Sequence, residues 1–298
     1  MSPVKATICL LAALALPACV SRAADTGLQA DTTVLVATVT GLSGPEAVRY
    51  DPEQDVYFVA NFNGRGDALD NNGFISRIRP DGGVDNLSFI AGGAQGTTLH
   101  APRGMFIAGD TLWAADVDAV RGFHRRTGAA VASIDFAGRD VGFLNDITRG
   151  PDGALYVTDT GRNLVYRVSG REIAVAIADS TLNRPNGITW DSGNNQFIIV
   201  PYGGRQTPFT WRGEPSAVQA GVTVPGGRFD GVEVLAGGLI IASQADSSLW
   251  SVRDGRVQRL TRTTGAPADI GLDTRRKRVA VPYIALNRVD IYQLPRGW

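Results

Sequence analysis

From residue 32 onward the chain alternates short apolar stretches with polar turns, and the pattern recurs as a unit. Each unit has an apolar strand, a turn, a second strand, a loop and a third strand with alternating apolar residues. The turns are rich in Asp, Gly and Asn, as in residues 150–153 and 191–195. Because the apolar runs are short and rich in β-branched and aromatic residues, they predict strands and not amphipathic helices. The chain is therefore expected to be all-β.

Six copies of the unit can be aligned at their first residues. These are Pro45, Pro102, Leu144, Pro185, Phe229 and Pro267. Their spacing matches the blade of a propeller, and the longest interval is too short for two blades. A seventh unit cannot be found. The pattern predicts a single domain over residues 24–298, a six-bladed β-propeller.

The last unit lacks one strand, and one additional strand precedes the first unit. The last unit reaches residue 298 without room for a fourth strand, while an additional strand, residues 32–40, precedes the first unit. We expect this N-terminal strand to join the sixth blade and close the ring. Such closure removes an exposed sheet edge and fixes both ends of the domain.

Residues 1–23 have the layout of a secretory signal peptide. Their apolar run, residues 8–16, is too short to span a bilayer. Two interpretations stay open: cleavage after the small-residue site 21–23, or a lipobox that lipidates Cys19, into which Pro17 fits poorly. We expect an exported protein, periplasmic or secreted, which is either soluble or a lipoprotein anchored through Cys19.

Composition excludes several classes of function. Lys plus Arg and Asp plus Glu both total 29, so the chain lacks the basic excess of a nucleic-acid-binding protein. Both cysteines, Cys9 and Cys19, lie in the leader, and the only histidines are His100 and His124. A thiol nucleophile, a disulfide and a zinc or copper site are thus disfavoured. We expect a monomer with no nucleic-acid partner and no transmembrane segment.

The second residue of each unit is the informative position. A propeller has a central channel, so equivalent positions of the innermost strands form a ring. The ring residues are Glu46, Arg103, Asn145, Asn186, Asp230 and Ala268. Two carboxylates and two amides on one axis form an oxygen-rich pocket of the kind that Ca²⁺ accepts. The alternative, that Asn and Asp cap turns here, does not explain Glu46.

At these positions the chain resembles a known family, the senescence-marker-protein-30, gluconolactonase and luciferin-regenerating-enzyme group, with the paraoxonases as more distant relatives. The resemblance covers nearly all of residues 32–298. It rests on Gly44-Pro45-Glu46, Leu144-Asn145-Asp146, Arg184-Pro185-Asn186-Gly187 and Phe229-Asp230-Gly231. It implies a six-bladed propeller that hydrolyses lactones or related esters. It also implies one divalent metal, held by Glu46, Asn145, Asn186 and Asp230.

The chemistry of such a site suggests a mechanism independently of the family resemblance. A bound Ca²⁺ can polarise a lactone carbonyl and stabilise the oxyanion that forms when water adds. A neighbouring carboxylate, Asp230 by preference and Glu46 second, can take the proton from that water. The expected function is an exported metal-dependent lactonase or esterase with a small-molecule substrate. The alternatives are a non-catalytic NHL-type propeller that binds a ligand or protein, and a phosphotriesterase using the same site.

Arg103 departs from the family pattern, because the comparable Pro-x-Gly motif of paraoxonase relatives carries a histidine. Arginine cannot act as a base, since it stays protonated. We expect Arg103 to point toward the channel mouth and grip a substrate carboxylate or the developing oxyanion. In the alternative it pairs with Glu46 or Asp230 and replaces the metal.

Three further acids are candidates for substrate contact. Ala268 offers no polar side chain, so its neighbour Asp269 is expected to line the gap in the ring. Asp116 and Asp159 end second strands and are expected near the rim, with turn capping as the alternative for each. The pocket is shaped by loops that do not dictate a particular substrate, residues 61–73, 91–100 and 203–228.

Overall fold

The structure is a computed structural model that describes residue 1 and residues 33–213 and 216–298. The expectations for the leader, its cleavage and the lipidation of Cys19 fall on residues 2–32, outside this described part. Among the described residues, no helix is both long enough and apolar enough to cross a membrane.

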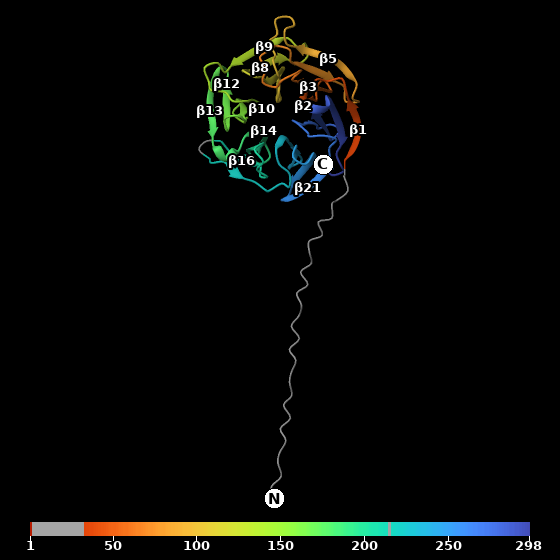
Figure 1. Cartoon of the computed structure of the whole chain (residues 1–298), viewed down its shortest axis with the longest axis vertical. Coiled ribbons are helices and arrows are strands. Elements are labelled where there is room, and N and C mark those ends of the chain that lie inside the picture. Colours follow the sequence, from red (N-terminus) through yellow and green to blue (C-terminus); the bar gives the residue numbers. More distant parts are fainter. Residues whose placement is uncertain (2–32, 214–215) are drawn as a thin grey trace.

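Six four-stranded antiparallel sheets stand around a central axis, as predicted (Figure 1). The first blade is β2 (Pro45–Asp51), β3 (Val56–Asn61), β4 (Phe74–Ile78) and β5 (Val84–Ala91). The second is β6 (Met105–Ala108), β7 (Thr111–Ala115), β8 (Ala119–His124) and β9 (Ala130–Asp135). The third is β10 (Leu144–Arg149), β11 (Leu155–Asp159), β12 (Leu164–Ser169) and β13 (Glu172–Ala178).

The fourth blade is β14 (Pro185–Asp191), β15 (Gln196–Pro201), β16 (Phe209–Trp211) and β17 (Gln219–Ala220). The fifth is β18 (Phe229–Leu235), β19 (Gly238–Ser243), β20 (Ser248–Arg253) and β21 (Arg256–Arg262). The sixth contains β22 (Gly271–Asp273), β23 (Arg278–Tyr283) and β24 (Arg288–Gln293). Two short 3₁₀ turns complete the described elements, η1 (Ser180–Leu182) and η2 (Ile284–Leu286).

The ring is closed as the sequence predicts. Strand β1 (Val34–Val39) is the outermost strand of the sixth blade and pairs antiparallel with β24, Val34 facing Gln293 and Val39 facing Val289. In Figure 1 β1 lies at the periphery, while β2, β10 and β14 lie toward the axis. Pairing of the first strand with the last ties the two ends of the domain together.

Apolar side chains fill the spaces between neighbouring blades. Between the third and fourth blades, the rings of Tyr156 and Phe197 lie 4.4 Å apart, and Trp211 packs against both. Near the axis the inner strands approach more closely. A Cβ on Gly187 would lie 2.2 Å from the carbonyl oxygen of Asp230, so only glycine fits there. The close approach brings ring residues of neighbouring blades together.

Candidate metal centre

Four ring residues converge on one cavity. Glu46, Asn145, Asn186 and Asp230 are the second residues of β2, β10, β14 and β18, and each is buried. All four line the same cavity, whose volume is about 420 Å³. The four residues expected to hold a metal are therefore together, at one end of the central channel.

Each of the four leaves one buried oxygen without a hydrogen-bond partner. These atoms are Glu46 Oε2, Asn145 Oδ1, Asn186 Oδ1 and Asp230 Oδ1. A buried acceptor with no partner costs about 1–3 kcal/mol, so four in one cavity call for a group that satisfies them. Two carboxylate and two amide oxygens form a donor set suited to a hard cation such as Ca²⁺, with waters completing its coordination. The residues present thus fit the expected metal.

The amide of Asn145 is oriented by Thr160. The Thr160 hydroxyl donates its only proton to the carbonyl oxygen of Pro185, at 2.7 Å, and can only accept from Asn145. Asn145 Nδ2 donates to it at 3.1 Å, which leaves Oδ1 as the unpartnered atom. The hydrogen-bond network therefore selects the amide orientation that a cation requires.

Replacing Thr160 tests this orientation. We expect Thr160→Val to weaken Ca²⁺ binding by about 10-fold, because the amide loses the partner that fixes its oxygen. Thr160→Ser keeps the hydroxyl and should bind Ca²⁺ as the wild type does. Isothermal titration calorimetry measures both variants, and equal affinity of Thr160→Val and wild type would contradict the assigned role.

A second hydrogen-bond chain orients Asp230. Arg228 donates to the hydroxyl of Tyr202, which donates to Gln244 Oε1 at 3.0 Å. Gln244 Nε2 then donates to Asp230 Oδ2 at 2.5 Å, leaving Asp230 Oδ1 unpartnered. Because every proton in this chain is donated toward Asp230, the chain favours the ionised carboxylate and fixes which oxygen remains available.

Burial counteracts this hydrogen bonding, because it favours the protonated form of the Asp230 and Glu46 carboxyls. It raises the pKa of Asp230 to about 7, with repulsion from Asp146 adding to the shift. It also raises the pKa of Glu46 well above its ordinary value, with Asp230 contributing further and Arg103 opposing. A divalent cation between the two carboxyls would favour the ionised form of each. Without a cation, burial and mutual repulsion oppose the ionisation of both at once.

Beneath the ring, the residue after the ring position is an acid in two of the six units, Asp146 and Asp269. Burial raises the pKa of Asp146 to about 6 and that of Asp269 well above its usual range. Arg49 pairs with Glu233 and lies 3.9 Å from Asp269 Oδ2. Asp269 is thus a buried residue of the channel, and it is not among the residues that line the cavity.

Arg103 binds backbone carbonyl groups and pairs with neither Glu46 nor Asp230. Its guanidinium is buried and donates to the carbonyl oxygens of Leu144 at 2.8 Å, of Asp116 at 3.3 Å and of Gly66. The ring of Phe143 lies 3.7 Å from its Cζ atom. No ion pair joins Arg103 to a described carboxylate, and it does not line the cavity. Its position supports a structural role and would leave the cavity open to a metal.

Asp116 and Asp159 cap the loops that lead into inner strands. Asp116 accepts from the backbone N–H groups of His100 and Ala101, and Asp159 from those of Gly142 and Phe143. Both are fully buried and neither lines the cavity. Their positions support the turn-capping alternative and give no support to the expected substrate contact.

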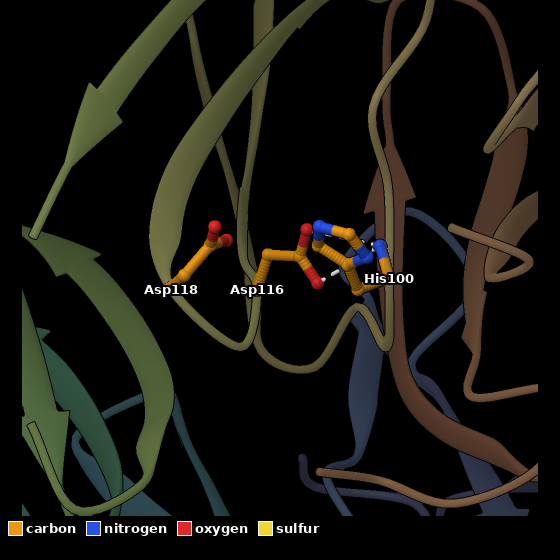
Figure 2. A group of neighbouring side chains, drawn as sticks. All are labelled: His100, Asp116 and Asp118. Carbon is orange, nitrogen blue, oxygen red and sulfur yellow. Dashed lines mark hydrogen bonds between the residues drawn. The ribbon is translucent and has the colours of Figure 1, made fainter. Parts of the chain in front are cut away.

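Figure 2 shows a second group with metal-ligating atoms, His100, Asp116 and Asp118, which lie within 4.8 Å of one another. Arg121 pairs with both acids, with Nε donating to Asp116 at 2.5 Å and Nη2 to Asp118 at 2.7 Å. His100 Nδ1 accepts from the backbone of Asn71. Because an arginine occupies the acids and the imidazole is engaged, we assign this group a structural role.

A further set of cavity residues was missed by the sequence analysis, although the repeat encodes it. The residue immediately after the second strand of each blade lines the cavity in five of the six blades. These residues are Phe62, Thr160, Tyr202, Gln244 and Ile284. Aligning the units one residue beyond Asp159 and Ser243 would have found them. Two sets of equivalent positions therefore supply most of the residues that line the cavity.

Comparisons with known structures support the fold. The chain resembles a gluconolactonase from Xanthomonas campestris with a TM-score of 0.68 and 18% identity, over 90% of this chain and 96% of that one. It resembles a streptogramin B lyase with a TM-score of 0.63 and 11% identity, over 88% and 98%. No protein-family model and no curated protein matches the sequence.

A third similar structure is a virginiamycin B lyase from Staphylococcus aureus with quinupristin. The TM-score is 0.57 and the identity 12%, over 90% of this chain and 97% of that one. That variant, in which one histidine is replaced by alanine, is catalytically inactive. At these low identities the TM-scores show the fold alone: the chain shares its propeller fold with these three proteins.

Proposed function

We propose that the protein is a metal-dependent hydrolase of lactones or related esters, and that Glu46, Asn145, Asn186 and Asp230 hold one Ca²⁺. The observation that carries the proposal is the set of four unpartnered oxygens in one cavity. The likeness of the fold to a gluconolactonase supports the reaction type. A cavity of about 420 Å³ suits a small molecule.

Bound at this site, Ca²⁺ would supply Lewis-acid polarisation of the substrate carbonyl. Asp230 is the preferred base, because its carboxyl group lines the cavity and is oriented there by Gln244. It takes a proton as water adds to the carbonyl carbon, and it returns that proton to the ring oxygen when the C–O bond breaks. Glu46 is the second candidate for this role. Phe62, Phe143 and Ile284 form the apolar wall that limits water.

A lyase reaction like that of the streptogramin-lyase neighbours is less well supported. Replacing one histidine inactivates the Staphylococcus aureus enzyme. In this chain the only histidines are His100 and His124, and neither lines the cavity. The oxygen-rich ring favours metal-assisted addition of water instead.

Metal removal tests the function. Treatment with a chelator should abolish turnover of simple lactones and lower the melting temperature, because a ligand that binds only the folded state stabilises it. Adding Ca²⁺ should restore both. A metal analysis of the untreated protein serves as the control. Unchanged activity and unchanged melting temperature after chelation would contradict the proposal, and calcium binding without turnover of any lactone or ester would favour a binding propeller.

We further propose that the protein is exported and monomeric, from the signal-peptide layout of residues 1–23 and the closed ring. The mass of the mature protein recovered from the producing cells separates the two processing alternatives. Cleavage after residue 23 leaves an unmodified chain, whereas lipidation leaves an acylated Cys19.

A further inference from the structure

Two arginines share one aromatic ring at the edge of the cavity. The guanidinium carbon of Arg184 lies 5.3 Å from the ring centre of Tyr202, and that of Arg228 lies 4.9 Å from it. Arg184 and Tyr202 line the cavity, and Arg228 donates to the Tyr202 hydroxyl. Both arginines are exposed at the surface.

Neither arginine has an acidic partner. In the part of the chain that the structure describes, no ion pair involves Arg184 or Arg228, and the Arg184 guanidinium donates no hydrogen bond to protein. The only acids that line the cavity are Glu46 and Asp230. With a divalent cation between those two carboxylates the floor of the cavity is neutral, which leaves two positive charges at its edge.

Both arginines also occupy backbone conformations that disfavour them. They stand two residues before the ring residue in neighbouring blades, Arg184 with φ of 64° and Arg228 with φ of 48°. The equivalent residue of the first blade is Gly44, with φ of 60°. Glycine adopts this left-handed region without strain, whereas a long side chain does so at a cost in free energy. Strained residues of this kind cluster at ligand-binding sites.

We propose that the substrate carries an anionic group, a carboxylate or a phosphate, and that Arg184 and Arg228 bind it at the edge of the cavity. The proposal rests on the lactonase function and narrows its substrate class. Guanidinium groups present planar pairs of N–H donors that match the oxygens of carboxylates and phosphates. An anion between them would also offset the repulsion of two like charges around Tyr202.

A structural role for Arg228 predicts a different result. Through Tyr202 and Gln244 it is linked to Asp230, and its charge lowers the pKa of that carboxyl against the effect of burial. If this were its only task, replacing it would impair hydrolysis of neutral and anionic substrates equally. Binding of a substrate anion as well predicts a larger loss on anionic substrates than on neutral ones.

The experiment compares three lactones: neutral D-glucono-1,5-lactone, the carboxylate D-glucaro-1,4-lactone and 6-phospho-D-glucono-1,5-lactone. For the wild type we expect kcat/KM at least 10-fold higher on one of the anionic lactones than on the neutral one. Arg184→Gln should lower kcat/KM on that anion about 10-fold, mainly through KM, with less than a twofold effect on the neutral lactone. Arg228→Gln also removes a donor from the hydrogen-bond chain to Asp230, so it should lower kcat/KM on every lactone, with a loss on the anion about 10-fold larger than on the neutral lactone. Arg171→Gln, an exposed arginine in the turn between β12 and β13, is the matched control.

Equal kcat/KM on all three lactones, or equal losses on all three in the variants, would overturn the proposal. Folding is checked separately with Arg184→Gly and Arg228→Gly, which relieve the backbone strain. They should keep the wild-type melting temperature while losing preference for the anion.

A binding measurement separates this proposal from the lactonase function. Calorimetry should show that D-glucarate, with two carboxylates, binds at least 10-fold more tightly than D-gluconate, and that the difference disappears in both glutamine variants. If no lactone is hydrolysed but this difference is present, the hydrolase proposal fails and the anion site stands. If lactones are hydrolysed and the two acids bind equally, the anion site fails.

Discussion

Asp230→Asn is expected to lower kcat/KM on lactones by about 10³-fold and to weaken Ca²⁺ binding at least 100-fold. The substitution removes one of the two charged oxygens that line the cavity and the preferred base in a single change. Lactone kinetics and calorimetry measure the two effects. Asp254→Asn, in the exposed turn between β20 and β21, is the matched control and should change neither quantity.

In the absence of metal, Asp230→Asn should stabilise the folded protein at neutral and alkaline pH. The pKa of Asp230 is raised from its ordinary 3.8 to about 7, so the folded state holds its proton more tightly than the unfolded state does. Stability is then fully present below about pH 4 and is lost as pH rises toward 7 and above, by at most about 4 kcal/mol. Chelator-treated Asp230→Asn should therefore unfold at higher denaturant concentration than wild type at pH 8, and the difference should shrink at pH 5. A less stable variant at pH 8 would contradict the unfavourable burial of this carboxylate.

Arg103 is expected to be essential for stability and dispensable for metal binding. Arg103→Ala should lower the free energy of unfolding by about 3–5 kcal/mol, because it leaves a cavity and removes the donor from three carbonyl oxygens, two of them in buried hydrogen bonds. Denaturant unfolding measures this loss. Arg103→Met retains much of the volume and should lose less.

Calcium binding by the wild type and by Arg103→Met tests whether the channel holds a metal or whether Arg103 takes the place of the metal. The wild type should bind Ca²⁺, and Arg103→Met should bind it more tightly, since the positive charge that acts on Glu46 is gone. Binding found only in Arg103→Met would instead show that Arg103 replaces the metal.

The ring could be predicted from sequence because a propeller repeats. Once the units are aligned, equivalent positions become neighbours around one axis, and the departures from apolar character at Glu46, Asn145, Asn186 and Asp230 identify the cavity. The closing strand followed from the same count, because the last unit lacked a strand and one preceded the first.

Side-chain directions could not be predicted in this way. Arg103 has several rotamers, and the carbonyls that fix it belong to Gly66, Asp116 and Leu144, which are brought together only by the fold. Asp159 ends its strand as expected, and Asp116 lies one residue beyond the end of β7. Their carboxylates point back to nearby backbone N–H groups, a local choice that a repeat alignment does not distinguish from a substrate contact.

The most direct test is a calorimetric titration of Ca²⁺ into chelator-treated protein. Because four unpartnered oxygens face one cavity, we expect one ion to bind per chain with Kd at or below about 10⁻⁵ M, and binding to be lost in Asp230→Asn. No heat of binding at millimolar Ca²⁺, or equal binding by Asp230→Asn and wild type, would contradict the assignment of this ring as a metal centre.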